Sequence, residues 1–71
     1  MEKENWRTKI GEQIRRRRKS LGMTQLELSE RTGLDRANIS KIEGGRYNVS
    51  VDILGRIAEV LRCEIKLNPE E

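Results

Sequence analysis

The stretch that decides the fold reads TQLELSERTGLDRANISKIEGG and covers residues 24–45. It contains two short helical patterns with a break at residues 32–34. Thr24 and Asp35 can cap the two helices, because their side-chain oxygens accept hydrogen bonds from free backbone N–H groups. Gly33 suits a turn that requires a positive φ. The stretch predicts a helix-turn-helix unit, in which the second helix can enter a DNA major groove.

The second helix of this unit has two different faces. At about 100° per residue, one side carries Ile39 and Ile42, and the other carries a small, polar and basic set: Arg36, Ala37, Ser40 and Lys41. An ordinary amphipathic surface helix would also look like this. The capped helix before it and the glycine in the turn favour a helix that lies in a groove.

The chain resembles the Cro/phage-repressor (Xre-type) helix-turn-helix family of transcriptional regulators. The matching residues are Leu21-Gly22-Met23-Thr24-Gln25, Leu28, Gly33-Leu34 and Ile39-Ser40-Lys41-Ile42-Glu43-Gly44-Gly45. With the pattern from Ile10 to Leu61, the resemblance covers about three quarters of the chain. Two positions depart from it: Ser29 stands where alanine is commoner, and Val49 where proline often precedes the last helix. The resemblance implies a compact, lambda-repressor-like DNA-binding domain.

Size and composition fit one small all-α domain with an aliphatic core. The chain has 71 residues, of which 34% are hydrophobic, with no Phe, one Trp and one Tyr. A domain of this size buries only about 60% of its unfolded surface, so it is marginally stable alone. We expect a four-helix bundle over residues 6–62, a frayed segment at 1–5 and a separate tail at 63–71.

Composition argues against several other functions. The chain contains no His and a single cysteine, Cys63, so neither a zinc site, an intrachain disulfide nor a general base for that thiol is expected. We therefore expect no enzyme activity, no cofactor and no metal. Because no signal peptide or membrane-spanning apolar run is present, a cytoplasmic location is expected.

The charge is modestly basic, with a formal net charge of +3. A run of five cations, Arg15-Arg16-Arg17-Arg18-Lys19, precedes the helix-turn-helix stretch. The run could be a solvated helix face or could face DNA phosphates. Its position favours the phosphate role.

The helices that flank the central stretch are expected to close the core. The first should run over residues 6–21, with Ile10, Ile14 and Leu21 buried and Gly22 ending it. The last should begin after Ser50 and end near residue 61 or 62. Its stripe of Leu54, Ile57, Ala58 and Leu61 should close the core, while Ile53 and Val60 form a second stripe available to a partner.

The tail changes period and predicts a short β-strand at residues 63–67. Cys63, Ile65 and Leu67 alternate with Glu64 and Lys66. A lone strand has no neighbour in an all-α domain, and some members of the family dimerise through such a strand. We therefore expect a homodimer interface of Ile53, Val60, Cys63, Ile65 and Leu67. A disordered or locally docked tail is the alternative.

The predicted DNA contacts are of two kinds. Bases should be read by Arg36, Ser40 and Lys41, with Ala37 available for a thymine methyl group. The backbone should be held by Gln25, Asn38, Arg46 and Asn48, with help from the basic run. The resemblance implies the phosphate roles of Gln25 and Arg46. It also implies a structural ion pair between Arg18 and Glu43.

These expectations combine into a sequence-specific double-stranded DNA-binding regulator. A repressor that binds a near-palindromic operator as a homodimer fits best, with half-sites about 34 Å apart. One alternative is the antitoxin of a toxin–antitoxin pair, which would also bind a toxin protein. Another is a protein-interaction module that does not bind DNA.

Overall fold

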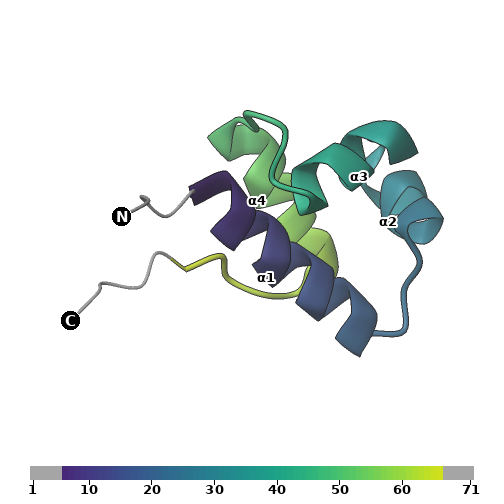
Figure 1. Ribbon diagram of the computed structural model, residues 1–71. Coiled ribbons are helices and arrows are strands. Elements are labelled where there is room, and N and C mark those ends of the chain that lie inside the picture. The colour runs from purple at the N-terminus through teal and green to yellow at the C-terminus, as the bar shows by residue number, and fades with distance from the viewer. Residues whose placement is uncertain (1–5, 67–71) are drawn as a thin grey trace.

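The computed structural model describes residues 6–66, and these form four α-helices. They are α1 (Trp6–Ser20), α2 (Gln25–Thr32), α3 (Arg36–Glu43) and α4 (Val51–Leu61), with α2 and α3 joined by a short turn (Figure 1). The predicted all-α, four-helix fold is confirmed. The segment expected to fray, residues 1–5, lies outside the described residues, as does Leu67. No helix in the described part of the chain is long and apolar enough to cross a membrane.

Local hydrogen bonds set the boundaries of α2. The Thr24 side chain accepts from the Glu27 backbone N–H at 3.0 Å, and the Glu27 carboxylate accepts from the Thr24 N–H at 2.8 Å. This reciprocal pair satisfies two donors that the first turn would otherwise leave free. Gly33 ends the helix with φ of 79°. The predictions for Thr24 and Gly33 are confirmed.

The predicted cap at Asp35 is wrong in its contact. Asp35 holds the N-cap position of α3, but its side chain makes no capping hydrogen bond. The first residues of α3, Arg36 and Ala37, are exposed. Water can therefore satisfy the free N–H groups at this end, and a cap is not required for the helix to begin.

The end of α1 decides which apolar side chain enters the core. Gly22 has φ of 69°, and the Met23 N–H donates to the Arg18 carbonyl at 3.1 Å. This reversal of the chain buries Met23, whereas Leu21 stays 43% exposed. The expectation that α1 extends to Leu21 and buries that side chain is therefore wrong.

The core is aliphatic, as composition predicts. Side chains from all four helices meet in it, and five are fully buried: Ile14, Leu28, Ile39, Ile57 and Leu61. Gly11 brings α1 and α3 close together, because a Cβ there would lie 2.7 Å from the Glu43 carbonyl oxygen and closer still to that of Ile42. The reading helix is therefore seated directly on the α1 backbone.

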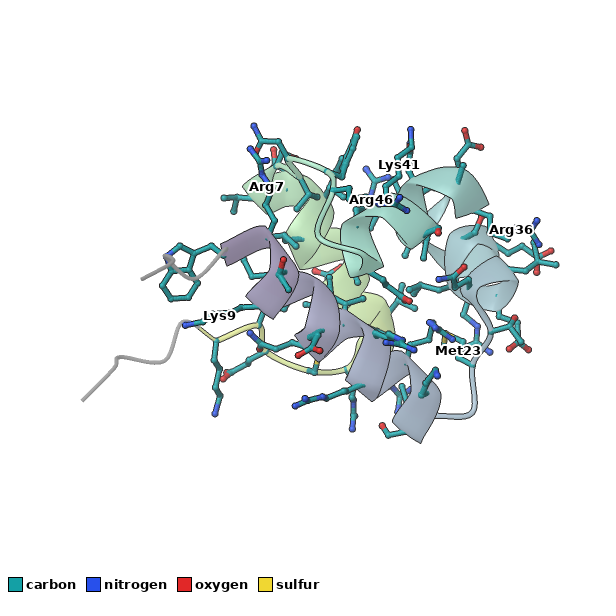
Figure 2. All side chains as sticks on the ribbon, in the orientation of Figure 1. Arg7, Lys9, Met23, Arg36, Lys41 and Arg46 are labelled. Carbon is teal, nitrogen blue, oxygen red and sulfur yellow. The ribbon has the colours of Figure 1, made fainter. Side chains whose placement is uncertain are left out.

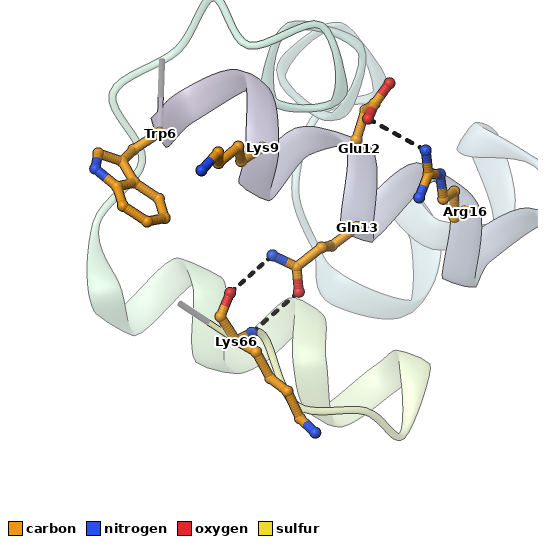
Figure 3. Close-up of a pocket in the computed structure, with 6 residues that line it drawn as sticks. All are labelled: Trp6, Lys9, Glu12, Gln13, Arg16 and Lys66. Atoms are coloured by element: carbon orange, nitrogen blue, oxygen red, sulfur yellow. Dashed lines mark hydrogen bonds and ion pairs between the residues drawn. The ribbon is translucent and has the colours of Figure 1, made fainter. Parts of the chain in front are cut away.

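The predicted strand is absent from residues 63–66, which dock on α1 instead. The Gln13 side-chain amide donates to the Lys66 carbonyl at 2.9 Å and accepts from the Lys66 N–H at 3.0 Å (Figure 3). One glutamine thus supplies the donor and acceptor that a neighbouring strand would supply. The locally docked alternative describes this part of the tail.

Candidate nucleic-acid interface

The outer face of α3 is polar and basic, and its inner face is sealed in the core. Ile39 and Ile42 are buried, while the predicted base-reading side chains are at least partly accessible: Arg36, Ala37 and Lys41 are exposed and Ser40 is half-buried. In Figure 2 the side chains of Lys41 and Arg46 extend on the same side of the molecule. The arrangement leaves the outer face of α3 open to a large ligand.

A polar hollow of about 300 Å³, here called the α2–α3 hollow, lies beside this face. It is lined by Arg15, Gln25, Ser40, Glu43, Gly44 and Arg46. Three predicted DNA-contacting residues therefore meet here with a cation from the basic run. Two guanidinium groups, an amide and a hydroxyl can donate hydrogen bonds into the hollow, which suits an anionic oxygen group such as a phosphate.

The structure brings Arg18 and Glu43 together behind the hollow. Arg18 Nε and Nη2 donate to the two carboxylate oxygens of Glu43 at 2.6 and 2.9 Å, and Arg18 Nη1 donates to the Met23 carbonyl at 2.7 Å. The two side chains are only 9% and 3% exposed. The hydrogen bond to Glu43 raises the pKa of Arg18 above its ordinary value. Both charges are thus paired and hydrogen-bonded, as burial requires.

Glu43 also holds one of the predicted phosphate-binding residues. Gln25 Nε2 donates to Glu43 Oε1 at 3.0 Å. An amide nitrogen carries two donors, so this bond leaves Gln25 one N–H for a ligand in the hollow. The buried ion pair therefore also orients a side chain at the surface.

The basic run does not act as one surface. Arg17 donates to the carbonyls of Leu61 and Arg62 at 2.9 and 3.1 Å and so covers the C-terminal end of α4. Arg18 is buried, and Arg16 lies 3.5 Å from Glu12 on α1. Arg15 lines the α2–α3 hollow. Sequence reasoning treated the run as a unit and did not single out Arg15 or the capping role of Arg17.

The loop after α3 places the remaining predicted backbone contacts. Arg46 and Asn48 are exposed, whereas Tyr47 is half-buried and packs against the core. Asn48 shares a small pocket with Arg7, near the start of α1. Figure 2 shows Arg7 along the same edge of the molecule as Lys41 and Arg46. Sequence reasoning missed Arg7, since only the fold brings α1 beside this loop. Asn38, on α3, is half-buried and does not line the hollow.

The predicted dimer residues do not share one free surface. Ile53, Val60 and Cys63 pack against the core and are only partly exposed. The apolar groove, here called the α4 groove, lies on a different face of α4 and has a volume of about 460 Å³. It is lined by Ile10, Val51, Leu54, Gly55, Ala58 and Ile65. The helical stripes of α4 are therefore rotated relative to the prediction, because α4 turns Ile53 and Val60 inward and leaves Leu54 and Ala58 at the edge.

Comparison with known proteins follows the same geometry. A family model described as helix-turn-helix matches residues 14–67. An uncharacterized HTH-type transcriptional regulator of Methanothermobacter thermautotrophicus is 50% identical over 51 residues, which cover 72% of this chain and 74% of that protein. The immunity repressor protein of Bacillus phage phi105 is 34% identical over 56 residues, which cover 79% of this chain and 39% of the repressor.

Two solved structures match in fold over most of the chain. The restriction-modification controller protein C.AhdI from Aeromonas hydrophila is 33% identical, with a TM-score of 0.78 over 82% of this chain and 88% of that one. A second restriction-modification controller, solved as a tetramer with its natural 35 base-pair operator, is 31% identical, with a TM-score of 0.79 over 87% and 82%. The chain therefore belongs to the Cro/phage-repressor (Xre-type) helix-turn-helix family of DNA-binding transcriptional regulators.

Proposed function

We propose that this protein is a sequence-specific, double-stranded DNA-binding repressor that acts as a homodimer on a near-palindromic operator. The observation that carries the proposal is the joining of two surfaces. The open face of α3 lies directly beside the α2–α3 hollow, and the two share Ser40. One surface can read base edges while the other holds the adjacent phosphate.

Base reading belongs to the exposed face of α3 in this proposal. Arg36 and Lys41 can donate to guanine O6 and N7, and the Ser40 hydroxyl can donate or accept. The Ala37 methyl group can contact the methyl group of thymine. All of these side chains project from one short helix whose position is fixed by Ile39 and Ile42 in the core.

Backbone positioning belongs to the hollow and the loop after α3. Arg15, Gln25 and Arg46 would hold one phosphate group in the α2–α3 hollow. The N-terminal end of α2 adds a favourable field for an anion at this place. Asn38 and Asn48 would donate to neighbouring phosphates. These contacts set the register of α3 in the groove and carry no sequence information themselves.

Repression and twofold binding are supported by the relatives. The phage relative is named an immunity repressor, and the controller relative was solved as a tetramer on its operator. A dimer would place two α3 helices in successive major grooves, about 34 Å apart. A bound dimer at a promoter would exclude other proteins from that DNA, which is the simplest route to repression.

Selection from random double-stranded DNA, followed by gel shifts over a salt series, tests the proposal. We expect an enriched site with twofold symmetry and an affinity that falls steeply as salt rises. Unrelated DNA should bind far more weakly at the same salt concentration. Failure to enrich any sequence, with no shift at low salt, would contradict the proposal and favour a module that does not bind DNA.

Arg36 and Arg46 provide a matched pair for separating the two kinds of contact. Arg36→Ala should weaken binding by about 1–3 kcal/mol and relax the preference at one base pair of each half-site. Arg46→Ala should weaken binding to all sequences alike and leave the preference intact. Binding to a panel of single-base operator variants measures both. If Arg36→Ala weakened every sequence equally, Arg36 would be a phosphate contact.

A further inference from the structure

We propose that the α4 groove is the surface through which two copies of this chain associate, with Gly55 at the point where their α4 helices approach most closely. The inference rests on the proposed homodimer and specifies how that dimer is built. It replaces Ile53 and Val60 with a different face of α4 and keeps Ile65 from the predicted set.

The groove is the kind of surface that a soluble protein covers. Its lining is apolar on every element: Ile10 from α1, Val51, Leu54, Gly55 and Ala58 from α4, and Ile65 from the tail. Val51 is 81% exposed, and the positions of Val51, Leu54, Gly55 and Ala58 repeat with helical spacing along one side of α4. A continuous exposed apolar stripe of this kind marks an interaction site more often than an isolated exposed side chain does.

Gly55 indicates what covers the groove. Glycine is the least favourable helix residue after proline, and Gly55 lies in the middle of α4. A Cβ at this position would meet nothing within 4 Å, so no part of the described chain needs a glycine here. Gly11 differs, since its missing Cβ makes room for the α3 backbone. The reason for Gly55 therefore lies outside the described part of the chain, in a partner that approaches α4 closely.

A second copy of the chain suits this site. In a twofold arrangement the same apolar stripe faces itself, so Val51, Leu54 and Ala58 find apolar neighbours without any new chemistry. Small residues such as Gly55 and Ala58 let two helix axes come closer than larger side chains would allow. None of the groove residues belongs to α2 or α3, so a copy bound here leaves the reading face open.

Docking of the tail supports the same surface. Ile65 reaches the groove because Gln13 holds the Lys66 backbone and Arg17 holds the end of α4. The tail thus completes one wall of the groove within its own chain. It contributes an apolar side chain to the interface without the paired strand that its sequence pattern predicts.

The test is Gly55→Leu, with Glu30→Leu as the matched control. The first adds a side chain where the isolated chain has open space, so folding should be preserved. The second adds the same side chain at an exposed position of α2 that is remote from the groove. Sedimentation over a dilution series should show a dimer for the wild type and for Glu30→Leu. Gly55→Leu should raise the dissociation constant at least about tenfold.

Circular dichroism and thermal melting should show that Gly55→Leu remains as helical as the wild type. A wild-type chain that stays monomeric across the series would overturn the proposal. A Gly55→Leu variant that dimerises like the wild type would overturn it too. Gel shifts keep the two proposals apart. If the dimer behaves as expected but no DNA binds, the proposed function fails and this surface stands. If the chain binds DNA but Gly55→Leu does not weaken its dimer, the reverse holds.

Discussion

Arg18 and Glu43 fix the reading helix against α1 with two charges that are almost wholly removed from water. The geometry is bidentate, and the third Arg18 nitrogen is used by the Met23 carbonyl. Such a pair adds little when compared with two apolar residues, but losing one partner strands the other. Its value to this molecule is orientation, because Glu43 also holds the Gln25 amide at the edge of the hollow.

Replacing Glu43 by Ala should therefore destabilise the protein strongly. Arg18 would remain buried without its carboxylate, at a cost of roughly 3–5 kcal/mol in the free energy of unfolding. Thermal or urea denaturation measures this loss. The control is Glu12→Ala, which removes the exposed contact with Arg16 and should cost no more than about 0.5 kcal/mol. Equal effects of the two substitutions would contradict a structural role for the buried pair.

The raised pKa of Arg18 also fixes a direction for pH dependence. A group with a raised folded-state pKa contributes stability that is fully present below its unfolded pKa and is lost as the pH rises through its folded pKa. For Arg18 both values lie in strongly alkaline solution. Titration of this residue should therefore leave stability unchanged near neutral pH.

At the scale of elements, the seating of α3 on α1 depends on a glycine inside a helix. Gly11 lets the α1 backbone touch the carbonyls of Ile42 and Glu43. Gly55 occupies an equivalent place within α4 but has open space around it. The two glycines have the same intrinsic cost in a helix and opposite surroundings. They therefore separate close packing from helix propensity.

Gly11→Ala should lower stability although alanine is the better helix former. Its methyl group would have to push backbone atoms of α3 aside, at a cost of about 1–3 kcal/mol. Gly55→Ala, measured at a dilution where the chain is monomeric, should raise the free energy of unfolding by about 0.4–1 kcal/mol. Denaturation of both variants gives the comparison. A stabilised Gly11→Ala variant would show that α1 and α3 are not in close backbone contact.

At the scale of the whole molecule, function depends on where the charges lie more than on their sum. The formal net charge is only +3, yet the cations of one short run serve different purposes. Arg17 covers the end of α4, Arg18 is buried, and Arg15 faces the hollow. The salt dependence of DNA binding should therefore distinguish neighbours in the sequence.

Arg15→Ala should lower the slope of log affinity against log salt by about one for each copy of the chain bound, because one phosphate contact is lost. Arg16→Ala changes the same net charge one residue away but removes a side chain that lines no part of the hollow. Its slope should match that of the wild type. Filter binding or fluorescence anisotropy over a salt series measures both slopes. Identical slopes for the two variants would remove Arg15 from the phosphate contacts.

The sequence alone determined the features that depend on neighbours within a few residues. Capping by Thr24, the positive φ of Gly33 and the two faces of α3 follow from hydrogen bonds and helical spacing inside residues 24–45. These are short-range effects, and a residue's own type nearly fixes them. The helix-turn-helix unit and the set of side chains on its open face were predictable for this reason.

The tertiary structure alone decided the features that depend on which segments meet. Whether Leu21 or Met23 enters the core is set by the chain reversal at Gly22, and whether the tail forms a strand is set by Gln13 on a helix about fifty residues away. The free face of α4 depends on how that helix is rotated against α1 and α2. Periodicity shows that α4 has more apolar surface than one core needs. It cannot show which part is used, because rotation about the helix axis is chosen by packing against segments that are distant in sequence.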